Sequence, residues 1–156
     1  MTGSTRKLIL GLATVGGMGY LPLMPGTCGS VAALPLWWFL AGLPPIKYGL
    51  VLGGVLILSI WVAGRAEFYL GQSDAPAIVI DEVVGLLITL AGCPRHWGWM
   101  LGGLLLFRVM DIWKPFPIDL INSQVKGGVG IVLDDVLAGI YAWIVLALLA
   151  RLLKLI

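Results

Sequence analysis

Charge is scarce in this chain of 156 residues, and three long segments have none. Only 12% of the residues are charged and 60% are hydrophobic, and residues 8–46, 48–64 and 136–150 contain no Asp, Glu, Lys or Arg. A helix that spans a membrane needs about 20 predominantly apolar residues. The absence of charge therefore argues against an ordinary water-soluble domain. It predicts an integral membrane protein, with a soluble but very apolar helical bundle as the alternative.

Acidic residues are missing from most of the chain. All eight lie between Glu67 and Asp135. Four of them form two adjacent pairs, Asp81-Glu82 and Asp134-Asp135, each at the start of an apolar run. A carboxylate at the centre of a membrane helix costs about 2.5–3.5 kcal/mol on insertion scales. Doubling the acids in one region therefore predicts a cation site. Without a cluster of thiolates or histidines nearby, it suits a hard ion such as Mg²⁺.

The net charge of +2 is too small to indicate a nucleic-acid partner. The position of the basic residues is more informative, because Arg65, Arg108, Lys114 and Lys126 all lie in or beside the acidic stretches. One interpretation is an anion bound next to a metal ion. The other is that these are cytoplasmic loop charges that follow the positive-inside rule.

The apolar runs predict an all-α integral membrane bundle of about five or six helices, as one domain over residues 1–156. Some segments are too short to span and are expected to be short or re-entrant, with a polar acidic site on one side. No segment shows a convincing strand pattern. The approximate helices expected are 8–21, 30–43, 46–70, 76–92, 97–113 and 131–153.

A consistent threading of these helices places the polar stretches on one side of the membrane. Six basic residues then lie on the side of the site: Arg6, Lys7, Arg65, Arg108, Lys114 and Lys126. Four lie on the other side: Lys47, Arg95, Arg151 and Lys154. The excess favours a cytoplasmic site, because cytoplasmic loops are richer in Lys and Arg.

Three charged residues, Arg108, Asp111 and Lys114, are spaced by three and would form one stripe on a helix. A charged stripe in an apolar helix is expensive unless it faces a polar site. The alternative is a salt-bridged helix end at the membrane interface. The stripe is therefore a candidate for binding an anion.

Two glycine-rich turns add candidate anion contacts. A glycine run precedes the second acidic pair, and its members with the preceding lysine are Lys126, Gly127, Gly128 and Gly130. Glycines before a helix let backbone N–H groups approach an anion at the helix N-terminus. The earlier turn, residues 25–30, offers the hydroxyls of Thr27 and Ser30, although it also suits a tight hairpin or a helix break. Together with Asp134 and Asp135, the glycine run at 127–130 predicts a phosphate cradle beside a metal ion.

Taken together, these motifs resemble the phosphatidylglycerophosphatase A family, which is related to the low-temperature-requirement C proteins. The motifs are GTCGS at 26–30 with ALP at 33–35, IDEVVG at 80–85, FRVMDIWKPFPI at 107–118 and KGGVGIVLDDVLAG at 126–139. The resemblance implies an all-helical, multi-pass protein of the bacterial inner membrane. It implies the Mg²⁺-dependent hydrolysis of phosphatidylglycerophosphate to phosphatidylglycerol and phosphate, with a phospholipid substrate and no nucleic-acid partner.

The resemblance also implies roles for individual residues. The catalytic acids would be Asp81, Glu82, Asp111, Asp134 and Asp135. The Mg²⁺ ligands among them would be Asp81, Glu82, Asp134 and Asp135. The groups facing the substrate would be Thr27, Ser30, Arg108, Lys114, Lys126, Gly127, Gly128 and Gly130.

The residues that a covalent phosphatase mechanism needs are missing. A cysteine phosphatase needs an arginine shortly after its thiolate, and the matching positions after Cys28 and Cys93 hold Leu34 and Trp99. The single histidine, His96, lies away from every motif. No Asp-x-Asp pair of the aspartyl-phosphate type occurs. Metal-activated water is the mechanism left. An ion-coupled transporter or another phospholipid-modifying enzyme is the alternative function.

Overall fold

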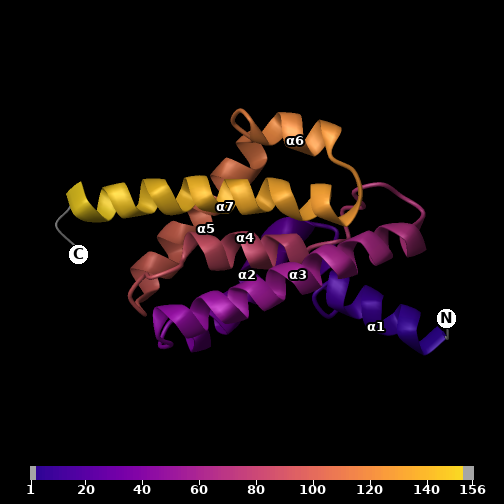
Figure 1. Ribbon diagram of the computed structural model, residues 1–156, viewed down its shortest axis with the longest axis horizontal. Helices are drawn as coiled ribbons and strands as arrows, with labels where there is room; N and C mark the ends of the chain where they lie inside the picture. Colours follow the sequence, from indigo (N-terminus) through magenta and orange to yellow (C-terminus); the bar gives the residue numbers. More distant parts are fainter. Residues whose placement is uncertain (1–2, 153–156) are drawn as a thin grey trace.

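The computed structural model describes residues 3–152, and in this part of the chain every regular element is helical (Figure 1). The predicted all-α class is confirmed. The helices are α1 (Gly3–Ala13), a 3₁₀ turn η1 (Met18–Tyr20), α2 (Pro25–Leu40), α3 (Pro45–Leu70), α4 (Ile80–Thr89), α5 (Trp97–Trp113), α6 (Ile118–Gln124) and α7 (Gly127–Leu152). The described range thus holds seven α-helices, where five or six were expected. Residues 153–156, including Lys154, lie outside this range.

The helix boundaries differ from the prediction where glycine or proline intervenes. The first helix ends at Ala13, because Gly16 and Gly17 take up positive φ angles. Helix α2 begins earlier than expected, at Pro25, which is well suited to a first helical position. Helix α7 also begins earlier, at Gly127. The predicted small-residue turns therefore lie within the first turns of α2 and α7.

Within residues 3–152, two helices are long and apolar enough to cross a membrane, α3 and α7, each with 26 residues. At about 1.5 Å per residue each is about 39 Å long, more than the ~30 Å of hydrocarbon core. The outer face of α3 is apolar, since Ile46, Leu50 and Ile57 are 72–79% exposed. A helix of a water-soluble protein would place polar residues there. These helices indicate association with a membrane.

Helix α4 lies at the centre, between α7, α3 and α2 (Figure 1). Most of its residues are buried, among them Val84, Leu86 and Leu87. One apolar cluster surrounds its second half and includes Trp37 and Phe107, and a second cluster surrounds its first half. The first turn of α4, which carries an acidic pair, is thereby held inside the bundle.

Two glycines let α4 and α7 approach each other closely, and the helices run in the same direction (Figure 1). A Cβ atom built on Gly139 would lie 2.5 Å from the carbonyl oxygen of Gly85. The hydroxyl of Thr89 is 2.9 Å from the Gly85 carbonyl oxygen and 3.3 Å from that of Gly139. Asp81 precedes Gly85 by one turn, and Asp135 precedes Gly139 by one turn. The glycine contact therefore brings two acids on different helices together.

Gly139→Ala should destabilise the protein by about 1–3 kcal/mol, because the new methyl group overpacks the contact with α4. The same change at Gly53 is the matched control, because a Cβ atom there meets nothing within 4 Å. Gly53→Ala should leave stability unchanged or raise it by about 0.5–1 kcal/mol. Thermal midpoints in detergent micelles measure both. Equal midpoints for the two variants would show that the helices are not in close contact.

Candidate active site

Three carboxylates meet where α4 and α7 converge. Asp81 and Glu82 lie in the first turn of α4, and Asp135 lies in α7. One oxygen atom from each falls within 4.8 Å of the others. Asp81 is 8% exposed and Asp135 is 3% exposed. The oxygens Asp81 Oδ1, Glu82 Oε2 and Asp135 Oδ2 are buried without a hydrogen-bond partner. The cluster thus offers unused, buried acceptors that converge on one point.

The electrostatics of this cluster favour a bound cation. Burial raises the pKa of Asp81 well above its usual range, and the nearby charges of Glu82 and Asp135 raise it further. Burial also raises the pKa of Glu82, although Arg108 opposes the rise. The repulsion between such carboxylates is relieved by a hard divalent ion, which takes oxygen ligands. The residues present therefore fit Mg²⁺, which stays a prediction.

Arg108 of α5 lies against the cluster with donors to spare. Its Nη1 is 2.7 Å from Asp111 Oδ2 and 3.8 Å from Glu82 Oε1. Although the first distance is short, the N–H groups are not aligned with the oxygen, and both Nε and Nη1 are buried without a hydrogen-bond partner. Asp111 therefore pairs with Arg108 by charge and leaves donors free for an anion.

Lys114 does not continue the stripe of Arg108 and Asp111. It caps the end of α5 with a positive φ of 45°, and its Nζ donates a hydrogen bond to Asp134 Oδ2. Burial lowers the pKa of Lys114, but the hydrogen bond and the charge of Asp134 outweigh this effect, so its pKa lies above the usual value. Asp134 thus pairs with a lysine and lies outside the three-carboxylate cluster.

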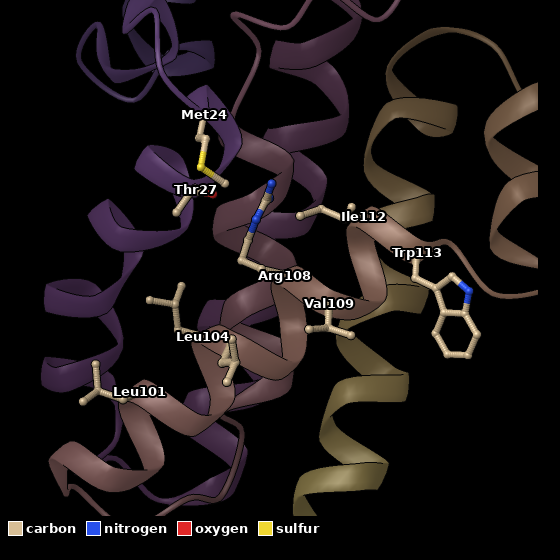
Figure 2. Close-up of a pocket in the computed structure, with 9 residues that line it drawn as sticks. Met24, Thr27, Leu101, Leu104, Arg108, Val109, Ile112 and Trp113 are labelled. Atoms are coloured by element: carbon tan, nitrogen blue, oxygen red, sulfur yellow. The ribbon is translucent and has the colours of Figure 1, made fainter.

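The first turns of α2 lie beside Arg108, as Figure 2 shows for Thr27. The hydroxyl of Thr27 is buried without a partner, whereas Ser30 donates its hydrogen to the Gly26 carbonyl oxygen. A Cβ atom on Gly26 would collide with Glu82 Oε1 and lie 2.9 Å from Arg108 Nη1. Gly26 therefore makes room for the charged groups, and Thr27 offers them a hydroxyl.

The glycine run before the second acidic pair lies elsewhere. Lys126, Gly127 and Gly130 line a narrow crevice with Glu67 and Asp74. A Cβ atom on Gly128 would collide with the Ile60 carbonyl oxygen, and one on Gly130 with the Val125 carbonyl oxygen. None of the four predicted residues of this run belongs to the carboxylate cluster or lines the groove beside Arg108. Packing explains at least two of these glycines.

The sequence did not reveal a mostly apolar groove that Arg108 borders. It has a volume of about 790 Å³, and Met24, Leu101, Leu105 and Val109 are among its lining residues (Figure 2). The recurrence of Leu101, Leu105 and Val109 at every fourth position was the available signal. In an apolar helix this spacing is equally typical of a face that packs in the hydrophobic core, so the pattern alone does not identify a groove.

The cysteines and the histidine have other surroundings. Burial raises the pKa of Cys93 to about 11, which disfavours a thiolate. Cys28 Sγ lies 3.6 Å from the Leu23 carbonyl oxygen. His96 Nδ1 accepts a hydrogen bond from the backbone N–H of Gly98 at the start of α5. No cysteine or histidine joins the carboxylate cluster in the described part of the chain.

Comparison with known proteins decides the family. The family model described as phosphatidylglycerophosphatase A matches residues 11–150. The chain belongs to the phosphatidylglycerophosphatase A family. Phosphatidylglycerophosphatase A of Escherichia coli (strain K12) is 38% identical over 130 residues, which cover 83% of this chain and 76% of that protein.

A second member of the phosphatidylglycerophosphatase A family gives the same result. Phosphatidylglycerophosphatase A of Haemophilus influenzae (strain ATCC 51907 / DSM 11121 / KW20 / Rd) is 40% identical over 136 residues, which cover 86% of this chain and 83% of that protein. No solved structure matches the chain significantly. The resemblance found in the motifs is thus confirmed over most of the chain.

Lys114→Met should lower the free energy of unfolding by about 1–3 kcal/mol, because it leaves Asp134 buried without its charged partner. In a protein that already carries Asp134→Asn, Lys114→Met should cost much less stability, because no charged partner is left unpaired. The effects of the two substitutions should therefore not be additive. Denaturant unfolding in micelles with EDTA measures the cycle without a metal contribution. Strictly additive effects would mean that the Lys114–Asp134 contact does not hold the end of α5 to α7.

Proposed function

We propose that this chain is a lipid phosphatase that hydrolyses the phosphomonoester of phosphatidylglycerophosphate, releasing phosphatidylglycerol and phosphate. The relatives from Escherichia coli and Haemophilus influenzae carry the name phosphatidylglycerophosphatase A. The observation that carries the proposal is the convergence of three carboxylates, two of them on buried residues, beside Arg108, whose donors are not all used. This arrangement suits a divalent cation next to a phosphate group.

In this proposal, Asp81, Glu82 and Asp135 hold Mg²⁺. When bound, the ion supplies charge neutralisation and Lewis acidity at the phosphate. Asp134 was also predicted to be a ligand from the sequence. Its hydrogen bond to Lys114 supports a different role, in which it fixes the lysine at the edge of the site. The metal experiment below separates the two roles.

The chain's own residues provide positioning and charge, which are most of what phosphoryl transfer asks of a protein. Arg108 donates hydrogen bonds to phosphate oxygens through Nε, which has no hydrogen-bond partner, and through Nη1, which is paired with Asp111 by charge only. Thr27 donates its unpaired hydroxyl hydrogen to the same group. Asp111, which follows Arg108 by about one helical turn, holds the guanidinium in place, with its Oδ2 2.7 Å from Nη1. Hydrogen-bond donors that are already in position around a developing negative charge lower the activation barrier, because the site does not have to reorganise during the reaction.

We further propose that the protein crosses the bacterial inner membrane several times and opens its site toward the cytoplasm. The basic residues support this orientation. At the end of the bundle near the site, Arg6 Nη2 lies 3.3 Å from the Tyr69 carbonyl oxygen, and Lys126 lines a crevice with Glu67. Cytoplasmic segments are enriched in such residues. A substrate headgroup at this interface would meet the carboxylate cluster directly.

The purified protein in detergent micelles should release inorganic phosphate from phosphatidylglycerophosphate, and EDTA should abolish the release. Asp135→Asn should lower kcat about a thousandfold, equivalent to about 4 kcal/mol of transition-state stabilisation. Asp119→Asn is the control, since Asp119 is exposed on α6 and accepts the backbone N–H of Leu120. Full turnover in EDTA would remove the metal from the proposal, and ion flux in liposomes without phosphate release would favour a transporter.

Added Mg²⁺ should raise the thermal midpoint of the wild-type protein above its value in EDTA, because the ion binds only the folded state. Asp81→Asn and Asp135→Asn should lose most of this increase, and Asp119→Asn should keep it. If Asp134→Asn keeps the increase, Asp134 acts through Lys114. If Asp134→Asn loses it while Asp135→Asn keeps it, the ligands are not the three that converge in the structure.

A further inference from the structure

The groove beside Arg108 follows one face of α5. The apolar residues of its wall on this helix are Leu101, Leu104, Leu105, Val109 and Ile112. Figure 2 shows Leu101, Leu104 and Val109 below the arginine and Ile112 beside it. These positions recur every three or four residues and so lie on one side of a helix. The wall is therefore apolar over several turns, except where Arg108 lies on the same face of the helix.

A second hollow continues along the same two helices. It has a volume of about 450 Å³ and lies between Val31, Leu34 and Trp38 of α2 and Trp97 and Met100 of α5. The larger groove also lies between α5 and the start of α2, where Met24 and Thr27 border it. Both hollows lie between α2 and α5, one beyond the other along the helices, and together we call them the α2–α5 seam.

The seam has a polar end and an apolar end. Thr27 and Arg108 lie near the first end, where Met24 and Ile112 also border the groove. Trp38 and Trp97 lie at the second end, with ring centroids 5.5 Å apart. The two ends are eleven positions apart on each helix. At about 1.5 Å per residue the seam is about 16 Å long, and one leaflet occupies about 15 Å of the ~30 Å hydrocarbon core.

The polar end suits a phosphate. Arg108 and Thr27 are the polar residues among those that line the larger groove in the described range. Both have buried donors without a partner: Thr27 Oγ1, Arg108 Nε and Arg108 Nη1. An occupant that satisfies both ends of the seam is an amphiphile with an anionic head and an apolar chain about one leaflet long.

We propose that the α2–α5 seam holds one acyl chain of the lipid phosphate substrate, with its phosphate at Arg108 and Thr27 and its chain directed toward Trp38 and Trp97. This inference rests on the proposed phosphatase function. The chain gains little from leaving the surrounding lipid, which is as apolar as leucine. The seam instead fixes the position of the phosphate relative to the carboxylates, and small misplacements of a reacting group reduce rates strongly.

The test compares two substitutions that fill the seam at different depths. Leu101 lies about 10 Å along α5 from Arg108 and Leu105 lies about 4.5 Å from it, at about 1.5 Å per residue. Both are largely exposed, 60% and 67%, so a larger side chain there does not enter the core. Ile57→Trp on α3 is the control, because Ile57 is 72% exposed and does not line the seam.

Each variant is assayed on dioleoyl, dihexanoyl and fully deacylated phosphatidylglycerophosphate. Leu101→Trp should lower kcat/KM about tenfold on the dioleoyl substrate only, because the short chain ends before residue 101. Leu105→Trp should lower it on both acylated substrates. Neither variant should change hydrolysis of the deacylated compound, and Ile57→Trp should match the wild type on all three.

Three outcomes would overturn the inference. In the first, both variants hydrolyse the dioleoyl substrate as the wild type does, which would mean that ordinary lipid fills the seam. In the second, both variants lose equally on all three substrates, which would mean that the substitutions distort Arg108 or block contact with a second copy of the chain. A wild-type protein that hydrolyses none of the substrates would refute the phosphatase function, and the inference with it. If Leu101→Trp does not fold, Leu101→Ala replaces it in the test, because it adds no bulk. Leu101→Ala should weaken the preference for the dioleoyl over the dihexanoyl substrate about threefold.

Discussion

The close contact of α4 and α7 at Gly85 and Gly139 is the constraint on which the rest of the structure depends. Each glycine follows an aspartate by one turn, so helices that run in the same direction and touch at the glycines also bring Asp81 and Asp135 together. A side chain at either glycine would separate the helices. Carboxylates on two helices can therefore converge on one point only because neither helix has a Cβ atom at this contact.

The cluster that results is costly without a compensating charge. Buried carboxylates raise one another's pKa and lose hydration. Arg108 offsets part of this cost through Glu82 and Asp111, and a divalent cation would offset the rest. The same arginine borders the apolar seam between α2 and α5. The proposed cation site and Arg108 would therefore face the phosphate of a lipid phosphate, and the α2–α5 seam would face its acyl chain.

The sequence predicted the long elements well and the site in part. Helix α5 has the predicted bounds, 97–113, and α3 begins only one residue before its predicted start, because apolar runs bounded by proline or charge leave little choice. Helix α6 was missed, since it is short and follows two prolines. Asp134 and Asp135 differ in direction by about 100° on a helix. An adjacent pair alone does not show which one faces Asp81, although the spacing from Asp135 to Gly139 repeats that from Asp81 to Gly85.

The central claim is that this helix contact builds a divalent cation site from Asp81, Glu82 and Asp135. The most direct test is a structure of the protein with Mn²⁺ in place of Mg²⁺, because the anomalous signal of manganese locates the ion independently of the protein atoms. The account predicts one strong anomalous peak bordered by oxygens of these three residues. A peak beside Asp134 and away from Asp81, or no peak at saturating Mn²⁺, would contradict it.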